Sequence, residues 1–328
     1  MQTFRALITE ISPEGKASTA LKSLPFTFLP ESDVLIKVAY SSLNYKDALS
    51  ASGHKGITRN FPHIPGIDAA GVVVSDLSGK FQTGARVVVT GFDMGMNSHG
   101  GLSEYIRVPA NWVIEIPTQL PTRIAMQWGT AGLTAAMAID ALITNQLSPN
   151  MGDVLVTGST GGVGMISIRL LSHLGFSFVA LSGKPALEES LKKLGALRVI
   201  SRQQFAEEPL RALYAMEYAG AIDTLGGNYL VQVVKRLQYG GSVAVCGMAA
   251  GVELPMQVYP FILRGTRMLG IYSAESPLSY KHAMWEKISD VWAVDLENIC
   301  QEIKLEEVPF VLEDMIAGNT SGRFVVKI

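Results

Sequence analysis

The chain has little cysteine, little net charge and no long hydrophobic run, and each shortage excludes a class of protein. Only Cys246 and Cys300 are present among its 328 residues, which excludes a disulfide framework and a four-cysteine zinc site. A formal net charge of −2 gives no basis for binding nucleic acid or an anionic membrane surface. No segment approaches the roughly 20 apolar residues that span a bilayer, and the N-terminus lacks the apolar core of a signal peptide. We therefore expect a cytoplasmic protein that binds neither nucleic acid nor membrane.

Histidine is also scarce, and its positions do not suggest a metal centre. The chain contains His54, His63, His99, His173 and His282, with no close pair at the helical or hairpin spacing of metal ligands. We expect these histidines to be surface or loop residues, and we expect no bound metal ion.

The most informative segment that is present runs from an apolar stretch into a cluster of glycines. It reads Val154-Leu-Val-Thr-Gly158-Ser-Thr-Gly161-Gly-Val-Gly164 and continues into helix-compatible residues 165–174. A strand, a glycine turn and a helix in this order present backbone N–H groups to a pyrophosphate, because glycine allows the tight turn and the close approach of phosphate oxygens. The three-residue spacing differs from the usual G-x-G-x-x-G. The segment predicts a dinucleotide site, and the alternative is a structural turn without a ligand.

The rest of the chain indicates two domains. A length of 328 residues exceeds one comfortable hydrophobic core, and 48% hydrophobic with 17% charged residues indicates a folded protein. The first third and the C-terminus are β-rich, and the middle alternates strands with helices, which predicts a parallel sheet covered on both faces. The strands are expected at 34–40, 70–74, 86–90, 154–157, 178–181, 198–200, 220–224, 242–246, 267–271 and 323–328. Helices are expected at 124–142, interrupted by Gly129 and Gly132, and at 165–174, 188–194 and 278–292.

The end of the second strand of this parallel sheet distinguishes the two nicotinamide cofactors. An NAD site places Asp or Glu there to accept hydrogen bonds from the ribose, whereas this chain has Ser182-Gly183-Lys184. A hydroxyl, a flexible backbone and a cation suit a phosphate dianion, and Arg202 after the third strand adds a second cation. The pattern favours NADP(H). The alternative is that Lys184 and Arg202 are ordinary surface charges.

Several motifs together resemble one family. They are Ser41-Ser-Leu-Asn-Tyr-Lys-Asp47, Asn60-Phe-Pro-His-Ile-Pro-Gly-Ile-Asp68, Gly129-Thr-Ala-Gly-Leu-Thr-Ala135, the glycine segment, Ala219-Gly-Ala-Ile-Asp-Thr224, Tyr239-Gly-Gly241, Pro260-Phe-Ile-Leu-Arg264 and Ser321-Gly-Arg323. The chain resembles the quinone-oxidoreductase-like branch of the medium-chain dehydrogenase/reductases and, within it, the acrylyl-CoA reductase group.

The resemblance implies an α/β protein of two domains. A GroES-like, β-rich catalytic domain would comprise residues 1–120 and 275–328, and a Rossmann domain with a doubly wound parallel sheet would bind NADP in residues 121–274. The family is usually homodimeric and reduces an activated carbon–carbon double bond of a small-molecule substrate with NADPH. Acrylyl-CoA, reduced to propionyl-CoA, is the leading substrate. A quinone is the alternative, and a protein that binds NADPH as a sensor or structural component without turnover is a third possibility.

The resemblance also implies which residues contact the cofactor. They are Tyr45, Thr160, Gly161, Gly162, Val163, Ser182, Gly183, Lys184, Arg202, Met248, Ile262, Ser273 and Arg323. Lys184 stands where relatives usually have Arg, and Tyr272 stands where many have an acid, so the fine chemistry of the pocket departs from the family pattern. Zinc-dependent members of the superfamily carry metal ligands where this chain has Asn44 and Gly66-Ile-Asp68, which gives a metal-free mechanism.

Asn44 and Tyr45 are the catalytic candidates. Hydride transfer to the β-carbon of an unsaturated thioester moves negative charge onto the carbonyl oxygen, which then needs a hydrogen-bond donor. An amide and a phenol are neutral donors of this kind, and in the family this segment lies beside the nicotinamide. The alternatives are that Tyr45 only positions the cofactor and that Asn44 caps a helix. Asp47 is expected to be a charge at that helix N-terminus.

Overall fold

The computed structural model describes residues 2–209 and 211–328, and the chain divides into two compact units. Unit 1 comprises Met1–Ala131, Ser273–Asp290 and Leu296–Ile328, and unit 2 comprises Gly132–Tyr272 and Val291–Asp295. The units thus divide at 131/132, 272/273, 290/291 and 295/296, whereas the domain boundaries predicted from the sequence lie at 120/121 and 274/275. The assignment of those domains stays a prediction.

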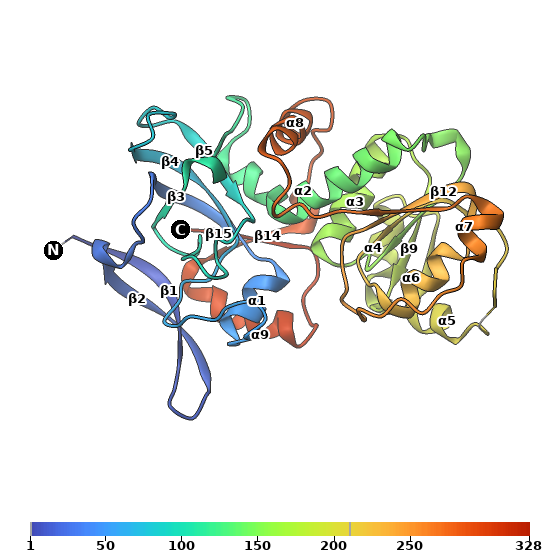
Figure 1. The fold of residues 1–328 in the computed structure, drawn as a ribbon, viewed down its shortest axis with the longest axis horizontal. Helices are drawn as coiled ribbons and strands as arrows, with labels where there is room; N and C mark the ends of the chain where they lie inside the picture. The colour runs from blue at the N-terminus through green and yellow to red at the C-terminus, as the bar shows by residue number, and fades with distance from the viewer. Residues whose placement is uncertain (1, 210) are drawn as a thin grey trace. The chain divides into compact units, whose positions relative to one another are not determined.

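Unit 1 is built on a seven-stranded, mainly antiparallel sheet (Figure 1). Its order is β14 (Cys300–Lys304), β15 (Arg323–Lys327), β3 (Val34–Ser42), β4 (Asp68–Asp76), β5 (Arg86–Thr90) and β7 (Ile114–Glu115), and β6 (Tyr105–Val108) also pairs with β3. Only β14 and β15 run parallel. Valine and isoleucine side chains fill the core on one face of the sheet, as expected of β-branched residues on a pleated surface. The strands expected at 34–40, 70–74, 86–90 and 323–328 are confirmed.

A hairpin, three whole α-helices and the first part of a fourth complete the described part of unit 1. Strands β1 (Thr3–Ile11) and β2 (Ala17–Pro25) form the hairpin, and α1 (Tyr45–Ala51) packs against α9 (Val308–Ile316). Neither strand of the hairpin was predicted from the sequence. In β2 only Leu24 is buried, and the strand lacks an apolar alternation. The third helix, α8, spans Leu278–Ser289 and ends earlier than expected, because Asp290 leaves the helical region with φ −132° and ψ −101°.

Unit 2 contains the expected parallel sheet. Its six strands lie in the order β10 (Arg198–Ser201), β9 (Phe178–Ser182), β8 (Val154–Thr157), β11 (Tyr218–Asp223), β12 (Leu237–Val245) and β13 (Arg267–Gly270). Numbered within the unit this is 3-2-1-4-5-6, the Rossmann order. Successive side chains point to opposite faces of a sheet, and every residue of β8, β9 and β11 is buried. Both faces are therefore covered, as predicted.

Six helices accompany this sheet in chain order. They are α2 (Thr122–Thr144), α3 (Gly162–His173), α4 (Glu188–Lys193), α5 (Arg202–Glu207), α6 (Gly227–Val234) and α7 (Tyr259–Arg264). Helix α2 begins in unit 1 and continues into unit 2. Its predicted interruption is confirmed at Gly129, where φ is 50° and ψ is −156°, values that a residue with a Cβ rarely adopts. The interruption predicted at Gly132 was wrong, because Gly132 keeps helical backbone angles within α2.

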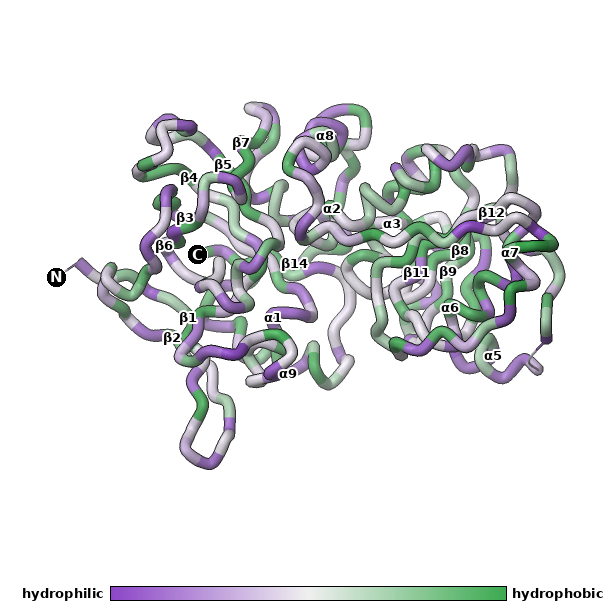
Figure 2. Tube along the Cα trace, viewed as in Figure 1, coloured by the Kyte–Doolittle hydropathy of each residue, from purple (hydrophilic) through white to green (hydrophobic). Residues whose placement is uncertain are grey.

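Hydropathy follows burial along the central strands of unit 2 but not along α7. Figure 2 shows green, apolar stretches along the buried strands β8 and β9 and also along α7, where Ile262 and Leu263 are exposed. Among the residues that the structure describes, no helix combines the length and the apolar character needed to cross a membrane.

Two histidines pack together where hairpin strand β1 meets the segment that precedes β4. The backbones of Thr9 and His63 exchange hydrogen bonds of 2.7 and 2.9 Å. The rings of His63 and His99 lie 5.6 Å apart, and His99 stacks on Phe28 at 4.6 Å. Burial lowers the pKa of both histidines, that of His99 to about 4.

We expect His99 to make the protein acid-sensitive between about pH 6.5 and pH 4. In this window the unfolded chain protonates His99 while the folded chain does not, so the free energy of unfolding falls as the pH falls. His99 is half-buried, and solvent screening reduces the effect of its lowered pKa, so we expect a contribution of about 1–2 kcal/mol. His99→Asn should therefore reduce the difference between urea unfolding free energies at pH 7 and pH 4.5 by this amount. The control is exposed His54, whose change to Asn should leave the difference unaltered. An unchanged difference in the His99 variant would contradict this assignment.

Candidate functional site

The predicted dinucleotide segment joins β8 to α3 at the carboxyl end of the sheet in unit 2. Helix α3 begins at Gly162, with Gly161 as its N-cap. The first N–H groups of a helix have no partner within it, and here they belong to Gly162, Val163 and Gly164. They carry the positive end of the helix dipole. The segment therefore has the geometry of a phosphate-binding turn.

The glycines of this turn are required by close packing. Gly158 has φ +59°, and a Cβ built there would lie 2.2 Å from the Thr224 Oγ1 atom. A Cβ built on Gly164 would lie 2.3 Å from the Gly158 carbonyl oxygen. By contrast, a Cβ on Gly161 would meet only the Gly158 oxygen, at 3.4 Å. The turn is thus tight on its inner side and open at Gly161, as a cradle for a phosphate needs to be.

A buried carboxylate supports this turn from the neighbouring strand β11. Thr157 Oγ1 donates to Asp223 Oδ1 at 2.7 Å, and the backbone N–H of Gly226 donates to Asp223 Oδ2 at 2.8 Å. Thr224 Oγ1 donates to the Thr157 carbonyl at 2.9 Å. Burial raises the pKa of Asp223. These bonds fix the end of β8 and the loop after β11 to each other. None of these four residues was predicted from the sequence as a site residue, because their contacts join distant parts of the chain.

The predicted 2′-phosphate residues lie together because of strand register. Strands β9 and β10 pair in parallel with Ser182 opposite Ser201, so the next residues, Gly183 and Arg202, leave the sheet side by side. A Cβ built on Gly183 would lie 3.3 Å from Arg202 Cδ. The backbone N–H of Lys184 donates to Ser182 Oγ at 3.0 Å and closes the turn. Partial burial lowers the pKa of the Lys184 amine, a cost that a bound phosphate dianion would offset.

The other residues implied by the resemblance occupy diverse settings. Thr160 is buried beside the glycine turn, and Met248 and Ile262 are exposed in unit 2. In unit 1, Ser273 is buried and Tyr45 is 53% exposed at the first position of α1. Their contact with a cofactor stays a prediction.

Unit 1 contains a buried polar cluster centred on Asp68, which we call the Asp68 hub. The side chains of Ser42 and Asn44 donate to Asp68 Oδ2, each at 2.7 Å. The Thr130 N–H and hydroxyl donate to Oδ1 at 3.0 and 2.5 Å. Arg323 Nη2 lies 3.9 Å from Oδ2. Asp68 and Arg323 are both buried, so the hydrogen bonds compensate a charge pair that water does not reach.

Arg323 directs its guanidinium entirely toward protein acceptors. Its five N–H donors face five acceptors, which are Gln127 O, Leu43 O, Asn44 Oδ1, Ser42 Oγ and Trp128 O at 2.7–3.5 Å. The predicted contact of Arg323 with the cofactor stays a prediction. Its contacts in the structure indicate a second role, which is to hold β3, the start of α1 and the bend at Gly129 together.

The two catalytic candidates, Asn44 and Tyr45, are adjacent in sequence but differ in whether their side chains can contact a ligand. The Asn44 amide donates to Asp68 and to the Ser42 carbonyl and accepts from Arg323, so it is engaged within the Asp68 hub. The ring of Tyr45 is half exposed. Asn44 is also the N-cap of α1, the alternative considered from the sequence. The geometry therefore favours Tyr45 as the group that reaches a ligand and Asn44 as the residue that positions it.

Asp47 lies in the first turn of α1, as expected. Its Oδ2 accepts the Asn44 N–H at 2.7 Å and its Oδ1 accepts the Ile67 N–H at 2.8 Å. Burial, reinforced by the nearby charge of Asp68, raises the pKa of Asp47 to about 7. Asp47 thus ties the beginning of α1 to the segment that leads into β4.

The Asp68 hub does not fit a zinc ion. Zinc requires thiolate, imidazole or carboxylate ligands, and the hub supplies one carboxylate whose oxygens already accept hydrogen bonds next to a guanidinium. Across residues 2–209 and 211–328, no group of three His, Cys, Asp or Glu residues has a metal-binding arrangement. We derive no step through a metal ion.

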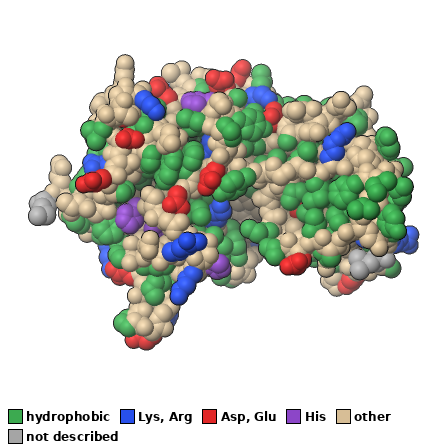
Figure 3. Space-filling view, viewed as in Figure 1, with side chains coloured by type: hydrophobic (Ala, Val, Ile, Leu, Met, Phe, Trp, Pro, Cys, Tyr) green, Lys and Arg blue, Asp and Glu red, His purple; other side chains and the backbone are tan. Residues whose placement is uncertain are grey.

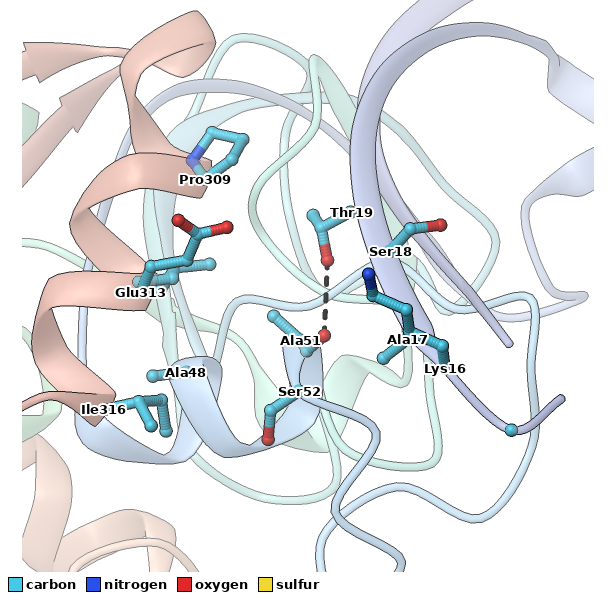
Figure 4. Close-up of a pocket in the computed structure, with 12 residues that line it drawn as sticks. Lys16, Ala17, Ser18, Thr19, Ala48, Ala51, Ser52, Pro309, Glu313 and Ile316 are labelled. Carbon is cyan, nitrogen blue, oxygen red and sulfur yellow. Dashed lines mark hydrogen bonds between the residues drawn. The ribbon is translucent and has the colours of Figure 1, made fainter. Parts of the chain in front are cut away.

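A separate cavity of about 430 Å³ lies in unit 1 between the β1–β2 hairpin, α1 and α9. Figure 4 shows Lys16, Ser18 and Thr19 on the hairpin side and Pro309, Glu313 and Ile316 on α9. None of the predicted site residues lines it. This hollow is therefore distinct from the candidate site.

We expect the Asp68 hub to be essential for the stability of unit 1. Asp68→Ala would leave the buried Arg323 charge without its carboxylate, which costs about 3–5 kcal/mol of unfolding free energy. Arg323→Met in the same chain should recover part of this loss, because the unpaired charge is removed. Urea unfolding of both single variants and the double variant measures the coupling. Strictly additive losses would contradict a coupled pair.

Comparison with known proteins identifies the family. Residues 30–118 match the model for the alcohol dehydrogenase GroES-like domain, and residues 162–290 match the model for the zinc-binding dehydrogenase domain. The acrylyl-CoA reductase AcuI of Ruegeria pomeroyi is 39% identical over 99% of both chains.

Solved structures agree over the whole chain. The yhdH oxidoreductase of Salmonella enterica, in complex with NADP, is 40% identical with a TM-score of 0.94 and 99% coverage of both chains. The Bacillus subtilis protein YhfP, with NAD bound, is 43% identical with a TM-score of 0.96 and 100% coverage of both. YhfP is named provisionally as a quinone oxidoreductase. Identity of this extent over the full length shows that the chain belongs to the medium-chain dehydrogenase/reductase superfamily. Within it, the chain is similar to the acrylyl-CoA reductases and the quinone oxidoreductases.

Proposed function

We propose that the chain is an NADPH-dependent oxidoreductase that reduces an activated carbon–carbon double bond, with acrylyl-CoA as its substrate and propionyl-CoA as its product. The observation that carries the cofactor assignment is the grouping of Ser182, Lys184 and Arg202 at one edge of the parallel sheet. Support for the substrate comes from the 39% identity to an acrylyl-CoA reductase over 99% of the chain.

The residues of unit 2 fit the two charged parts of NADPH. The α3 N-terminus, with Thr160, Gly161, Gly162 and Val163, would hold the pyrophosphate. Ser182–Lys184 and Arg202 would hold the 2′-phosphate, since a hydroxyl, an amine and a guanidinium complement a dianion. NAD lacks this phosphate, so these cations favour NADPH even though a relative has been crystallised with NAD. Met248, Ile262, Ser273, Tyr45 and Arg323 are proposed as the remaining contacts.

Tyr45 is our candidate for the residue that donates a hydrogen bond to the substrate carbonyl oxygen. When bound, NADPH would supply a hydride to the β-carbon, which would place negative charge on the substrate carbonyl oxygen until the α-carbon takes a proton from water. A half-exposed phenol can donate to that oxygen without becoming charged itself. Asn44, held by the Asp68 hub, would fix the start of α1 and so the direction of the Tyr45 side chain.

A comparison of substrates tests the function. With NADPH and the purified chain, we expect kcat/KM for acrylyl-CoA to exceed that for small quinones by about tenfold or more, as expected of a site that binds the transition state of one substrate better than that of the other. A strong quinone preference would replace our substrate with the alternative suggested by YhfP. Tight NADPH binding without turnover of either class would instead indicate a sensor or structural role.

We also propose that the chain forms a homodimer through one face of unit 2. Apolar side chains are exposed in and before α7, namely Val252, Val258, Tyr259, Ile262 and Leu263. Figure 3 shows a broad hydrophobic patch over α6 and α7, larger than the scattered apolar residues usual on monomers. In the described sheet, β13 is an edge strand, and an edge strand can pair with its own copy across a two-fold axis.

Light scattering tests the dimer. The chain has a mass of 35.3 kDa, and we expect the purified protein to have about twice that mass. Leu263→Glu should shift it to the monomer because it buries a charge in the interface. The control is Leu197→Glu, which alters an equally exposed leucine before β10. A monomeric parent, or a dimer that survives Leu263→Glu, would contradict this interface.

A further inference from the structure

Tyr229 on α6 lies outside the family motifs, yet its ring faces Arg202, the cation predicted to bind the 2′-phosphate. The guanidinium carbon of Arg202 lies 5.1 Å from the centre of the Tyr229 ring. We infer that Tyr229 is a positioning residue that sets the preference for NADPH over NADH by holding Arg202 in place for the 2′-phosphate. This inference rests on the proposed function, because it concerns the same cofactor site.

The Tyr229 ring is itself held by a buried neighbour. Phe205 stacks on it with ring centres 6.4 Å apart and planes 15° from parallel. Phe205 is buried on α5, three residues after Arg202, and α5 packs on α6. Residues three apart share a helix face, so Arg202 and Phe205 approach Tyr229 from the same helix. The aromatic ring is therefore a fixed surface for the guanidinium.

The contact with Tyr229 uses no N–H donor of Arg202. A cation–π contact is an attraction between the positive charge and the ring face, so the guanidinium N–H groups stay free to donate hydrogen bonds to a phosphate. Within the part of the chain that the structure describes, no carboxylate forms an ion pair with Arg202. The same side chain borders Gly183, where a Cβ would lie 3.8 Å from Arg202 Nη1. The rim of Arg202 thus lies next to the Ser182–Lys184 turn.

Because Tyr229 restricts Arg202 before the cofactor binds, less side-chain entropy is lost on binding. A free arginine side chain loses rotamer freedom when it orders on a phosphate, and one that already contacts a ring loses less. The contribution expected from such a cation–π contact is about three- to thirtyfold in affinity. It applies only to a ligand that uses Arg202, which is NADPH and not NADH.

A double-mutant cycle tests this inference. The dissociation constants of NADPH and NADH would be measured by fluorescence titration for the parent, Tyr229→Leu, Arg202→Ala and the double variant. We expect Tyr229→Leu to weaken NADPH about three- to thirtyfold and to leave NADH within about twofold. In the Arg202→Ala background it should have no further effect on NADPH. Tyr229→Phe keeps the ring and should behave as the parent, and Tyr239→Leu, at an exposed tyrosine of unit 2, is the matched control.

The outcomes separate the inference from the proposed function. Equal weakening of NADPH and NADH by Tyr229→Leu, or additive effects in the cycle, would overturn the inference and leave NADPH as the cofactor. A parent protein that binds both cofactors equally would overturn the proposed cofactor preference, and the inference with it. If Tyr229→Leu does not fold, Tyr229→Met keeps an apolar side chain on Phe205 without an aromatic face, and the same selective loss is expected.

Discussion

Parallel pairing of β8, β9 and β10 is the constraint on which the nucleotide site depends, because it makes three chain segments leave the sheet at one edge. Thr157 lies opposite Leu181, and Ser182 lies opposite Ser201. The glycine turn, the Ser182–Lys184 turn and Arg202 therefore become neighbours although they are far apart in sequence. A shift of register by one residue would turn their side chains to the other face of the sheet. The glycines, the buried Asp223 and the Tyr229 ring all act within the frame that this register sets.

Unit 1 is organised around a different constraint, the burial of opposite charges. Burying Asp68 and Arg323 is tolerable only when nearly every donor and acceptor is satisfied, and the chain achieves this with Ser42, Asn44 and Thr130. The same bonds hold the start of α1 and the bend at Gly129, where a Cβ would lie 2.4 Å from Ser42 Oγ. The hydrogen bonds that compensate the buried Asp68–Arg323 pair thus also fix the position of Tyr45 at the start of α1.

The sequence predicted the parts of the fold that depend on local patterns. Apolar runs such as Val154–Thr157 and Phe178–Leu181 identify buried strands by composition alone, and glycines at 158, 161 and 164 identify the turn between strand and helix. Lys184 and Arg202 could be connected because parallel strands end at the same edge. Hairpin strand β2 was not predicted, because only Leu24 of its residues is buried and the strand shows no apolar alternation.

The Asp68 hub and the Tyr229 contact could not be predicted, because each depends on tertiary contacts between distant residues. Asp68 and Thr130 are 62 residues apart, and Ser42 and Arg323 are 281 apart. Asn44 was proposed from the sequence as a donor to substrate, whereas the structure shows its amide bonded within the hub. No periodicity distinguishes Tyr229 from other aromatic residues on helices that cover the sheet.

Recognition of the 2′-phosphate by unit 2 is the central claim, and calorimetric titration with two small ligands tests it most directly. Adenosine 2′,5′-bisphosphate and adenosine 5′-monophosphate differ only in that phosphate. The account predicts that the bisphosphate binds at least about tenfold more tightly, as expected for charge-assisted hydrogen bonds from Lys184 and Arg202, and that the difference shrinks as salt is added. Equal affinities for the two ligands would contradict it.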